Sequence, residues 1–299
     1  MTSLRRNTVD LHTHTARSDG ILEPLELYEQ MRAWGSTLVA ITDHDTLAGV
    51  REMLAAGCGA PGTTGPRLIV GVEINTMVDA EVEAVGGTEE RLLELHILGL
   101  GMDPDDATLS ETLERQRGAR ERRLRRTLER LRELGMPVDE HLPQAEGGID
   151  ALGRPHVARA LVSAGHAEDV QDAFARYLVP GMPAYVRRQG IGPRAAIEAI
   201  IAAGGIASLA HASWAADEPE VIDELMRWGL GALEVHYHHW DEERIERMGA
   251  FADDRGLLHT GGSDYHGDTE TYAESQSAVF VPPIAGERLL TALGSVIEL

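Results

Sequence analysis

The sequence predicts an α/β fold, a closed or nearly closed barrel of seven strands with helices packed between most of them. Short runs rich in Val, Ile and Leu alternate with helical stretches, which is the pattern of parallel strands joined by crossover helices. Hydrophobic residues make up 43% of the 299 residues, enough to bury one large α/β core or two modest ones. This composition excludes an intrinsically disordered chain and a fibre.

The expected elements follow in chain order. We expect strands at residues 8–11, 37–42, 67–74, 92–100, 205–210, 232–235 and 257–260. Between them we expect helices that include residues 24–34, 193–203, 218–228 and 241–255. Pro24, Pro193 and Pro219 each stand where the first turn of a helix tolerates proline, and they support three of these starts.

The alternation stops between residues 103 and 192, where helical patterns continue without a strong strand. We therefore expect residues 1–102 and 193–299 to form the barrel and residues 103–192 to form an inserted helical subdomain. Its longest helix, residues 111–134, carries nine arginines and five glutamates and ends before Gly135. That composition fits a solvated helix with Glu–Arg pairs four residues apart, and the alternative is a surface for an anionic substrate.

Charge and cysteine content narrow the class of protein. The formal net charge of −22 argues against a surface that binds duplex nucleic acid, because such binding depends on neutralising phosphates. No segment approaches the roughly 18 apolar residues of a membrane helix. Cys58 is the single cysteine, so no internal disulfide can form, and the start of the chain has no apolar signal segment. We expect a cytoplasmic protein that does not bind membranes.

Histidines and acids gather at the ends of the predicted strands. In α/β barrels the carboxyl ends of the strands share one face, which is where active sites form. Histidine and carboxylate ligands without cysteine suit Zn²⁺, Mn²⁺ or Fe²⁺, and nine candidates are enough for two or three ions. In a His-x-His pair on an extended segment, both rings point the same way. The candidates are His12, His14, Asp19, His44, Glu73, His96, His211, Asp264 and His266.

Six motifs that contain these residues resemble, in order, those of the polymerase and histidinol phosphatase (PHP) superfamily. They are DLHTHTARSDG at 10–20, ITDHDT at 41–46, GVEI at 71–74, ELHILGLG at 94–101, LAH at 209–211 and GGSDYH at 261–266. The resemblance implies a distorted seven-stranded (β/α) barrel. The segments at 154–165 and 174–186 are similar to a branch of stand-alone phosphoesterases, which includes 3′,5′-nucleotide bisphosphate phosphatases and a 5′→3′ exoribonuclease.

The resemblance also implies three metal sites. The first ion would be held by His12, His14, Glu73 and Asp264, with Glu73 bridging to a second ion held by His96 and His211. A third ion would take Asp19, His44 and His266. We expect Asp43 to orient an imidazole, and Asp45 either to do the same or to cap a helix.

Such a cluster predicts phosphoester hydrolysis without a serine or cysteine nucleophile. The ions would lower the pKa of a bridging water, so that hydroxide attacks phosphorus, and would neutralise the phosphoryl oxygens. Arg154 and His156 match the family's Arg-x-His pattern, so we expect them to bind substrate, and His156 could also protonate the leaving group. Arg17, and Arg187 or Arg188, are further substrate-binding candidates.

The loop after His211 departs from the family pattern. Relatives commonly read Ala-His-Pro-Gly-Arg there, whereas this chain has Ala212 in place of proline and no nearby arginine. Trp214 on this loop could stack on a base, or simply pack. Further along, strand alternation predicts that His236 points to the same side as Glu234.

The predicted function is metal-dependent hydrolysis of phosphate esters of nucleotides, either 3′,5′-bisphosphonucleotides or short 5′-phosphorylated oligonucleotides. The first alternative is a histidinol-phosphate phosphatase or another small phosphomonoesterase. The second is a metal-binding accessory module without catalysis, like the polymerase-associated members of the superfamily.

Overall fold

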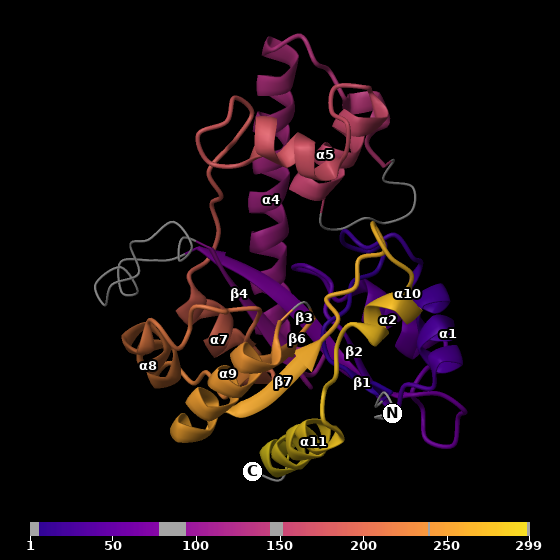
Figure 1. The fold of residues 1–299 in the computed structure, drawn as a ribbon, viewed down its shortest axis with the longest axis vertical. Coiled ribbons are helices and arrows are strands. Elements are labelled where there is room, and N and C mark those ends of the chain that lie inside the picture. Colours follow the sequence, from indigo (N-terminus) through magenta and orange to yellow (C-terminus); the bar gives the residue numbers. More distant parts are fainter. Residues whose placement is uncertain (1–5, 78–93, 144–151, 239, 298–299) are drawn as a thin grey trace.

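The predicted seven-stranded barrel is confirmed in a computed structural model that describes residues 6–77, 94–143, 152–238 and 240–297 (Figure 1). The strands are hydrogen-bonded in chain order from the first to the seventh. Each overlaps the expected stretch of sequence, and β3, β6 and β7 continue two or three residues beyond it. The strands are β1 (Val9–Asp10), β2 (Leu38–Ile41), β3 (Arg67–Met77), β4 (Glu94–Leu100), β5 (Ile206–Leu209), β6 (Ala232–Tyr237) and β7 (Leu258–Gly262).

The expectation that the strands are parallel is wrong for β4. This strand is antiparallel to both β3 and β5, whereas the other neighbouring pairs in the sheet are parallel. The reversal has a consequence for the site. His96 lies near the amino end of β4 and pairs with Asn75 near the carboxyl end of β3, so it reaches the same face as the residues that follow the parallel strands.

Backbone hydrogen bonds between the segment that follows β1 and the end of β7 close the barrel. The Leu11 amide donates to the Gly261 carbonyl at 3.0 Å, and the Asp264 amide donates to the His12 carbonyl at 2.8 Å. A Cβ at Gly262 would lie 2.5 Å from the His12 backbone nitrogen. Glycine therefore permits the close approach of the two segments that carry His12 and Asp264.

Helices cover the outside of the barrel and one of its ends. The first begins at Pro24, as expected, and stops at Gly35, whose φ of 85° favours glycine. Buried side chains of β1, β2 and β4 form an apolar cluster with α11, which lies below the sheet in Figure 1. None of the helices among the described residues is long and apolar enough to cross a membrane. The barrel helices are α1 (Pro24–Trp34), α2 (Ala48–Ala55), α7 (Pro193–Ala202), α8 (Pro219–Arg227), α9 (Glu242–Arg255), α10 (Tyr272–Ser277) and α11 (Pro283–Ile297).

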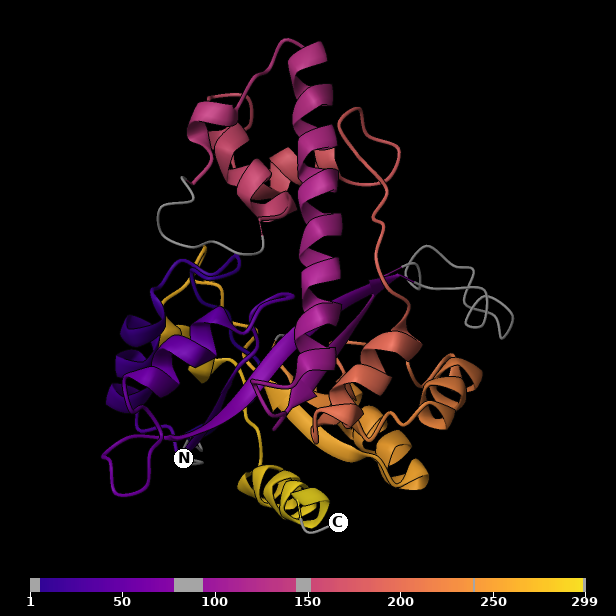
Figure 2. The ribbon, with the colours of Figure 1, turned by 180° about the vertical axis from the view of Figure 1, so that it is seen from behind.

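A long helix rises from the barrel between β4 and α7. This helix, α4 (Ala107–Glu133), is capped by Asp106, whose side chain accepts a hydrogen bond from the Leu109 amide at 2.7 Å. Both views show α5 beside its far half (Figure 2). Here Leu128 and Leu131 pack with residues of the following helices in an apolar cluster separate from the barrel core. The other helical elements of this stretch are η2 (Asp139–His141), α5 (Arg154–Ser163), α6 (Val170–Ala173) and η4 (Phe174–Leu178).

Candidate metal centre and active site

The structure brings all nine predicted ligand residues together at one end of the barrel. They fall into three groups, and within each group the potential ligand atoms lie within 4.8 Å of one another. Glu73 belongs to two groups and His14 to two, so the groups are contiguous. The groups are His12, His14, Glu73 and Asp264; Glu73, His96 and His211; and His14, Asp19, His44 and His266.

The first group has the geometry of a four-ligand site. Nε2 of His12 lies 3.3 Å from Oε2 of Glu73 and 3.2 Å from Oδ1 of Asp264, and the corresponding distances from His14 Nε2 are 3.2 and 3.1 Å. Tetrahedral ligands about 2.0–2.2 Å from an ion would be about 3.3–3.6 Å apart. His12 Nε2, His14 Nε2 and Glu73 Oε2 are buried and have no hydrogen-bond partner among the described residues. Divalent metal fits this set of donors.

The two oxygens of Glu73 face different groups. Oε2 faces the first group, whereas Oε1 lies 2.7 Å from His96 Nδ1 and 3.3 Å from His211 Nε2. This carboxylate can therefore bridge two ions. Its position follows from the sheet, because β3 pairs with β4 and places Glu73 two residues from the partner of His96.

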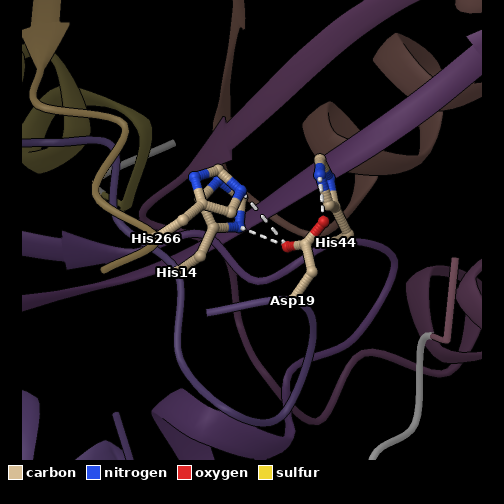
Figure 3. Close-up of side chains that lie close together, drawn as sticks. All are labelled: His14, Asp19, His44 and His266. Atoms are coloured by element: carbon tan, nitrogen blue, oxygen red, sulfur yellow. Dashed lines mark ion pairs between the residues drawn. The ribbon is translucent and has the colours of Figure 1, made fainter. Parts of the chain in front are cut away.

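The third group is shown in Figure 3. Oδ1 of Asp19 lies 3.3 Å from His266 Nε2, and Oδ2 lies 3.4 Å from His44 Nε2. The ring of His14 stacks on that of His266, with centroids 4.2 Å apart. Nδ1 of His14 is 3.7 Å from Asp19, so this histidine borders two groups at once.

The pKa values show strong mutual stabilisation of opposite charges. Burial lowers the pKa of His14, but the adjacent carboxylates of Asp264 and Glu73 outweigh it and raise the value to about 10. Burial raises the pKa of Glu73, yet the neighbouring His44 and His12 hold it well below its usual range. The carboxylates are thus ionised and ready to bind cations. Protons on the imidazoles would compete with metal for the same atoms.

Three residues at the site adopt left-handed backbone conformations that non-glycine residues rarely use. They are Asp45 with φ of 55°, His211 with φ of 33° and Asp264 with φ of 50°. Two of them are predicted ligands and the third adjoins His44. Backbone strain of this kind persists where surrounding contacts fix the side chain, and it concentrates at functional sites.

Glu234 is a site residue that the motif reasoning missed. It is fully buried on β6, accepts a hydrogen bond from His12 Nδ1 at 3.0 Å and accepts another from the His211 amide at 2.7 Å. With Glu234 as the acceptor, the His12 proton lies on Nδ1, and the Nε2 lone pair is directed at the first group. The sequence feature that could have identified Glu234 is a single acidic residue between Leu233 and Val235 in a strand that is otherwise apolar.

The expectation for His236 is wrong, because a β-bulge between Glu234 and His236 shifts the alternation of β6. His236 instead lies beside His259, with ring centroids 5.9 Å apart. Tyr237 takes the position on the site side, and its hydroxyl donates to Asp264 Oδ2 at 2.8 Å. Nothing in the local sequence indicates this shift.

Asp43 and Asp45 support the site differently from the expectation. Asp43 accepts hydrogen bonds at 2.7 Å from the Thr15 amide, the Thr15 hydroxyl and the Ser18 hydroxyl, so it holds the loop before Asp19 rather than an imidazole. Asp45 does not cap α2, which begins after Leu47. It binds Arg120 at 2.5 Å and Arg188 at 3.1 Å instead.

An open cavity lies over the three groups. Its floor includes Asp19, His44, Glu73, His96, His211, Asp264 and His266, and its wall includes Arg120, Arg123, Arg154 and Arg188. Two of these arginines come from α4, so the interpretation of that helix as merely solvated is wrong on this face. Burial lowers the pKa of Arg188 to about 9, and repulsion from Arg120 adds to the effect. Nε of Arg188 has no hydrogen-bond partner among the described residues.

The structure separates the two residues of the Arg-x-His pattern. Arg154 begins α5, lines the cavity and binds Glu94 at 3.2 Å. His156 is buried and accepts a hydrogen bond from the Gly153 amide at 3.1 Å. Burial lowers its pKa to about 4, although nearby Asp19 opposes the shift. A neutral, buried imidazole behind the wall fits a role in holding α5 and the adjacent loop.

Two substrate-binding candidates lie elsewhere. Arg17 is engaged by Glu52 at 2.7 Å and by Glu23 at 2.8 Å. Arg187 is exposed and points away from the cavity, whereas its neighbour Arg188 faces it. Trp214 is half-buried and packs against the barrel core.

Comparisons with known proteins agree with this arrangement. Residues 10–178 match the PHP domain model. The chain is 32% identical to a 5′-3′ exoribonuclease of Haemophilus influenzae, over 86% of this chain and 89% of the relative. It is 29% identical to a 3′,5′-nucleoside bisphosphate phosphatase of Chromobacterium violaceum, over 92% and 93% of the two chains.

A solved structure from Bifidobacterium adolescentis is described as a metal-dependent phosphoesterase. It superimposes on this chain with a TM-score of 0.79. The sequence identity is 32%, and the match covers 97% of this chain and 98% of the other. The seven-stranded barrel, the convergent histidines and acids, and these full-length matches have one explanation. The chain belongs to the PHP domain family and is a metal-dependent phosphoesterase.

Proposed function

We propose that this enzyme hydrolyses phosphate esters of nucleotides, namely 3′,5′-bisphosphonucleotides or short 5′-phosphorylated oligonucleotides. The observation that carries the proposal is the placement of four arginines in the wall of the cavity whose floor is the predicted metal centre. A substrate with two phosphates, or a phosphate and a phosphodiester, can use both surfaces. The names of the relatives support the same substrate class.

In this proposal, His12, His14, Glu73 and Asp264 would hold one ion, and Glu73, His96 and His211 would hold a second. Asp19, His44 and His266 would hold a third. Bound divalent ions would supply Lewis acidity, making a water acidic enough to provide hydroxide near neutral pH. Glu234 keeps the His12 tautomer in which Nε2 can ligate. Tyr237 fixes Asp264 through its hydroxyl.

The arginines bind the parts of the substrate that do not react. In a chain of net charge −22, Arg120, Arg123, Arg154 and Arg188 concentrate positive charge at one cavity. Burial lowers the pKa of Arg123 to about 10, and repulsion from Arg154 contributes. Asp45 pairs with Arg120 and Arg188, and Glu94 pairs with Arg123 and Arg154, so two carboxylates face four arginines and positive charge is in excess. A phosphate group would relieve that repulsion and accept hydrogen bonds in a bidentate manner.

We also propose that residues 103–192 form an inserted subdomain that recognises substrate. Two of its helices supply Arg120, Arg123 and Arg154, and the segment after η4 supplies Arg188. The location in the cytoplasm and the identity of the metals remain predictions from the single cysteine and from the donor types. Mn²⁺, Zn²⁺ and Fe²⁺ all suit these donors.

The test is phosphate or nucleotide release by the Mn²⁺-reconstituted protein. Four substrates are compared: 3′,5′-bisphosphoadenosine, a short 5′-phosphorylated RNA, AMP and histidinol phosphate. We expect the bisphosphate or the RNA to give the highest kcat/KM. Preference for histidinol phosphate would refute the proposal, because its cationic amine should be disfavoured beside four arginines. Stable metal binding without turnover of any substrate would favour the accessory-module alternative.

A further inference from the structure

The third ligand group depends on the close approach of two loops. Its members Asp19 and His266 lie in loops outside the strands, so the sheet does not fix their separation. One direct link between these loops is the hydrogen bond from the Ile21 amide to the His266 carbonyl, at 2.9 Å. The Asp19 carboxylate must nevertheless lie within reach of His266 for one ion to bind both.

Arg159 on α5 contacts both loops with one guanidinium group. Its Nη2 donates to the Asp19 carbonyl at 2.6 Å and to Asp268 Oδ2 at 2.5 Å, and its Nε donates to Asp268 Oδ1 at 2.7 Å. Asp268 lies two residues after His266. The planar guanidinium fork thus spans the two ligand-bearing loops, and it is bonded to the backbone of one of the ligands.

These contacts fit a positioning role better than a charge effect. The Arg159 charge is paired with the Asp268 carboxylate in a bidentate manner, while the contact with Asp19 is made to its backbone carbonyl rather than to its carboxylate. A lysine could supply the charge but could not make three hydrogen bonds in the same plane. The helix that carries Arg159 also carries Arg154 at the cavity wall.

We propose that Arg159 is a positioning residue that assembles the third ion site, by holding the Asp19 loop against the segment that follows His266. The inference rests on the proposed metal centre. It adds a role for the helical stretch beyond substrate recognition, because α5 would complete a metal site in the barrel. The other two groups make no contact with Arg159 among the hydrogen bonds of the described residues, so their ions should bind independently of it.

The experiment measures Mn²⁺ stoichiometry and affinity without substrate, by elemental analysis after equilibrium dialysis at graded Mn²⁺ concentrations. The variants are Arg159→Ala, Arg159→Lys and Asp268→Asn. The matched control is Arg176→Ala, which removes an arginine from an exposed ion pair with Asp172 in the same helical stretch. Thermal melting of each metal-free protein reports on folding.

We expect three equivalents in the wild-type and control proteins. In all three test variants the third equivalent should bind at least about tenfold more weakly, with the first two unchanged. Should Arg159→Ala fail to fold, the isosteric Asp268→Asn variant still tests the contact.

Unaltered binding of three ions by the folded variants would overturn the proposal, as would full rescue by lysine. Equal weakening of all three ions would indicate a general structural role and would also overturn it. Binding of only two Mn²⁺ equivalents by the wild-type protein would show that the third site does not exist and would overturn the proposal. The proposed hydrolysis would be unaffected by that result. Failure of the proposed function would instead appear as absent turnover with normal metal binding.

Discussion

Replacing Glu234 by glutamine should weaken binding of the first metal ion about 10- to 100-fold. The carboxylate accepts hydrogen bonds from His12 Nδ1 at 3.0 Å and from the His211 amide at 2.7 Å. An amide oxygen can keep one of these bonds, but the amide NH₂ then faces the other donor. Loss of one hydrogen bond to a charged group costs about 1.5–3 kcal/mol, or about 10- to 150-fold in affinity. Supporting residues of metal ligands typically contribute about 10- to 100-fold.

The assay is competition between the protein and a chelator for Zn²⁺ or Mn²⁺, at fixed pH, with melting of the metal-free protein as a measure of folding. Glu198→Gln is the matched control, since Glu198 is an exposed partner of Arg194 on α7. A metal affinity of the Glu234→Gln protein within about threefold of the wild type would refute the reasoning. It would mean that the tautomer and orientation of His12 are set by other contacts.

Three further predictions concern the ligands, the cavity wall and pH. His14→Ala should remove metal and activity while leaving circular dichroism nearly unchanged, because His14 borders two groups; retained metal content and turnover would contradict the assignment. Arg188→Ala should lower kcat/KM for a bisphosphate about 10- to 100-fold with metal retained, through loss of hydrogen bonds to a charged group. Arg187 is the exposed neighbour of Arg188, and Arg187→Ala should change kcat/KM by no more than about twofold. Equal losses of kcat/KM in the two variants would argue against the proposed cavity wall. In the metal-free protein, the pKa of His14 is raised from 6.5 to about 10, so its stabilisation is complete below pH 6.5 and disappears as pH rises through about 10. Between pH 6.5 and about 10, the melting temperature of the metal-free wild-type protein should therefore fall more than that of a metal-free His14→Gln variant. Parallel plots of melting temperature against pH would contradict the raised pKa of His14.

Much of the barrel was predictable because its signals are local. Apolar runs and prolines at helix starts identify where strands and helices lie, and α1 begins and ends at the expected residues. The direction of β4 was not predictable in this way, since a strand has the same apolar pattern whichever way it runs. Pairing with β3 and β5 determines the direction, and that pairing is long-range.

The substrate side of the site was the least predictable part. All 27 basic residues are arginines, and no spacing distinguishes those that converge from those engaged in surface ion pairs. Arg17 matched the expectation by position, but Glu23 and Glu52 bind it. Arg187 and Arg188 are adjacent in an extended segment, where neighbouring side chains point to opposite sides. Only the packing of that segment decides which one enters the cavity.

The sequence by itself determined the donor set, because a His-x-His pair and acids at strand ends are chemical identities at fixed positions along the chain. It also determined the face on which they meet, since the ends of barrel strands share one side. Only the tertiary structure decided that Glu234 holds His12, that a bulge exchanges His236 for Tyr237, and that Arg159 spans two loops. These contacts join residues far apart in the chain, and their geometry depends on register and packing that no local pattern encodes.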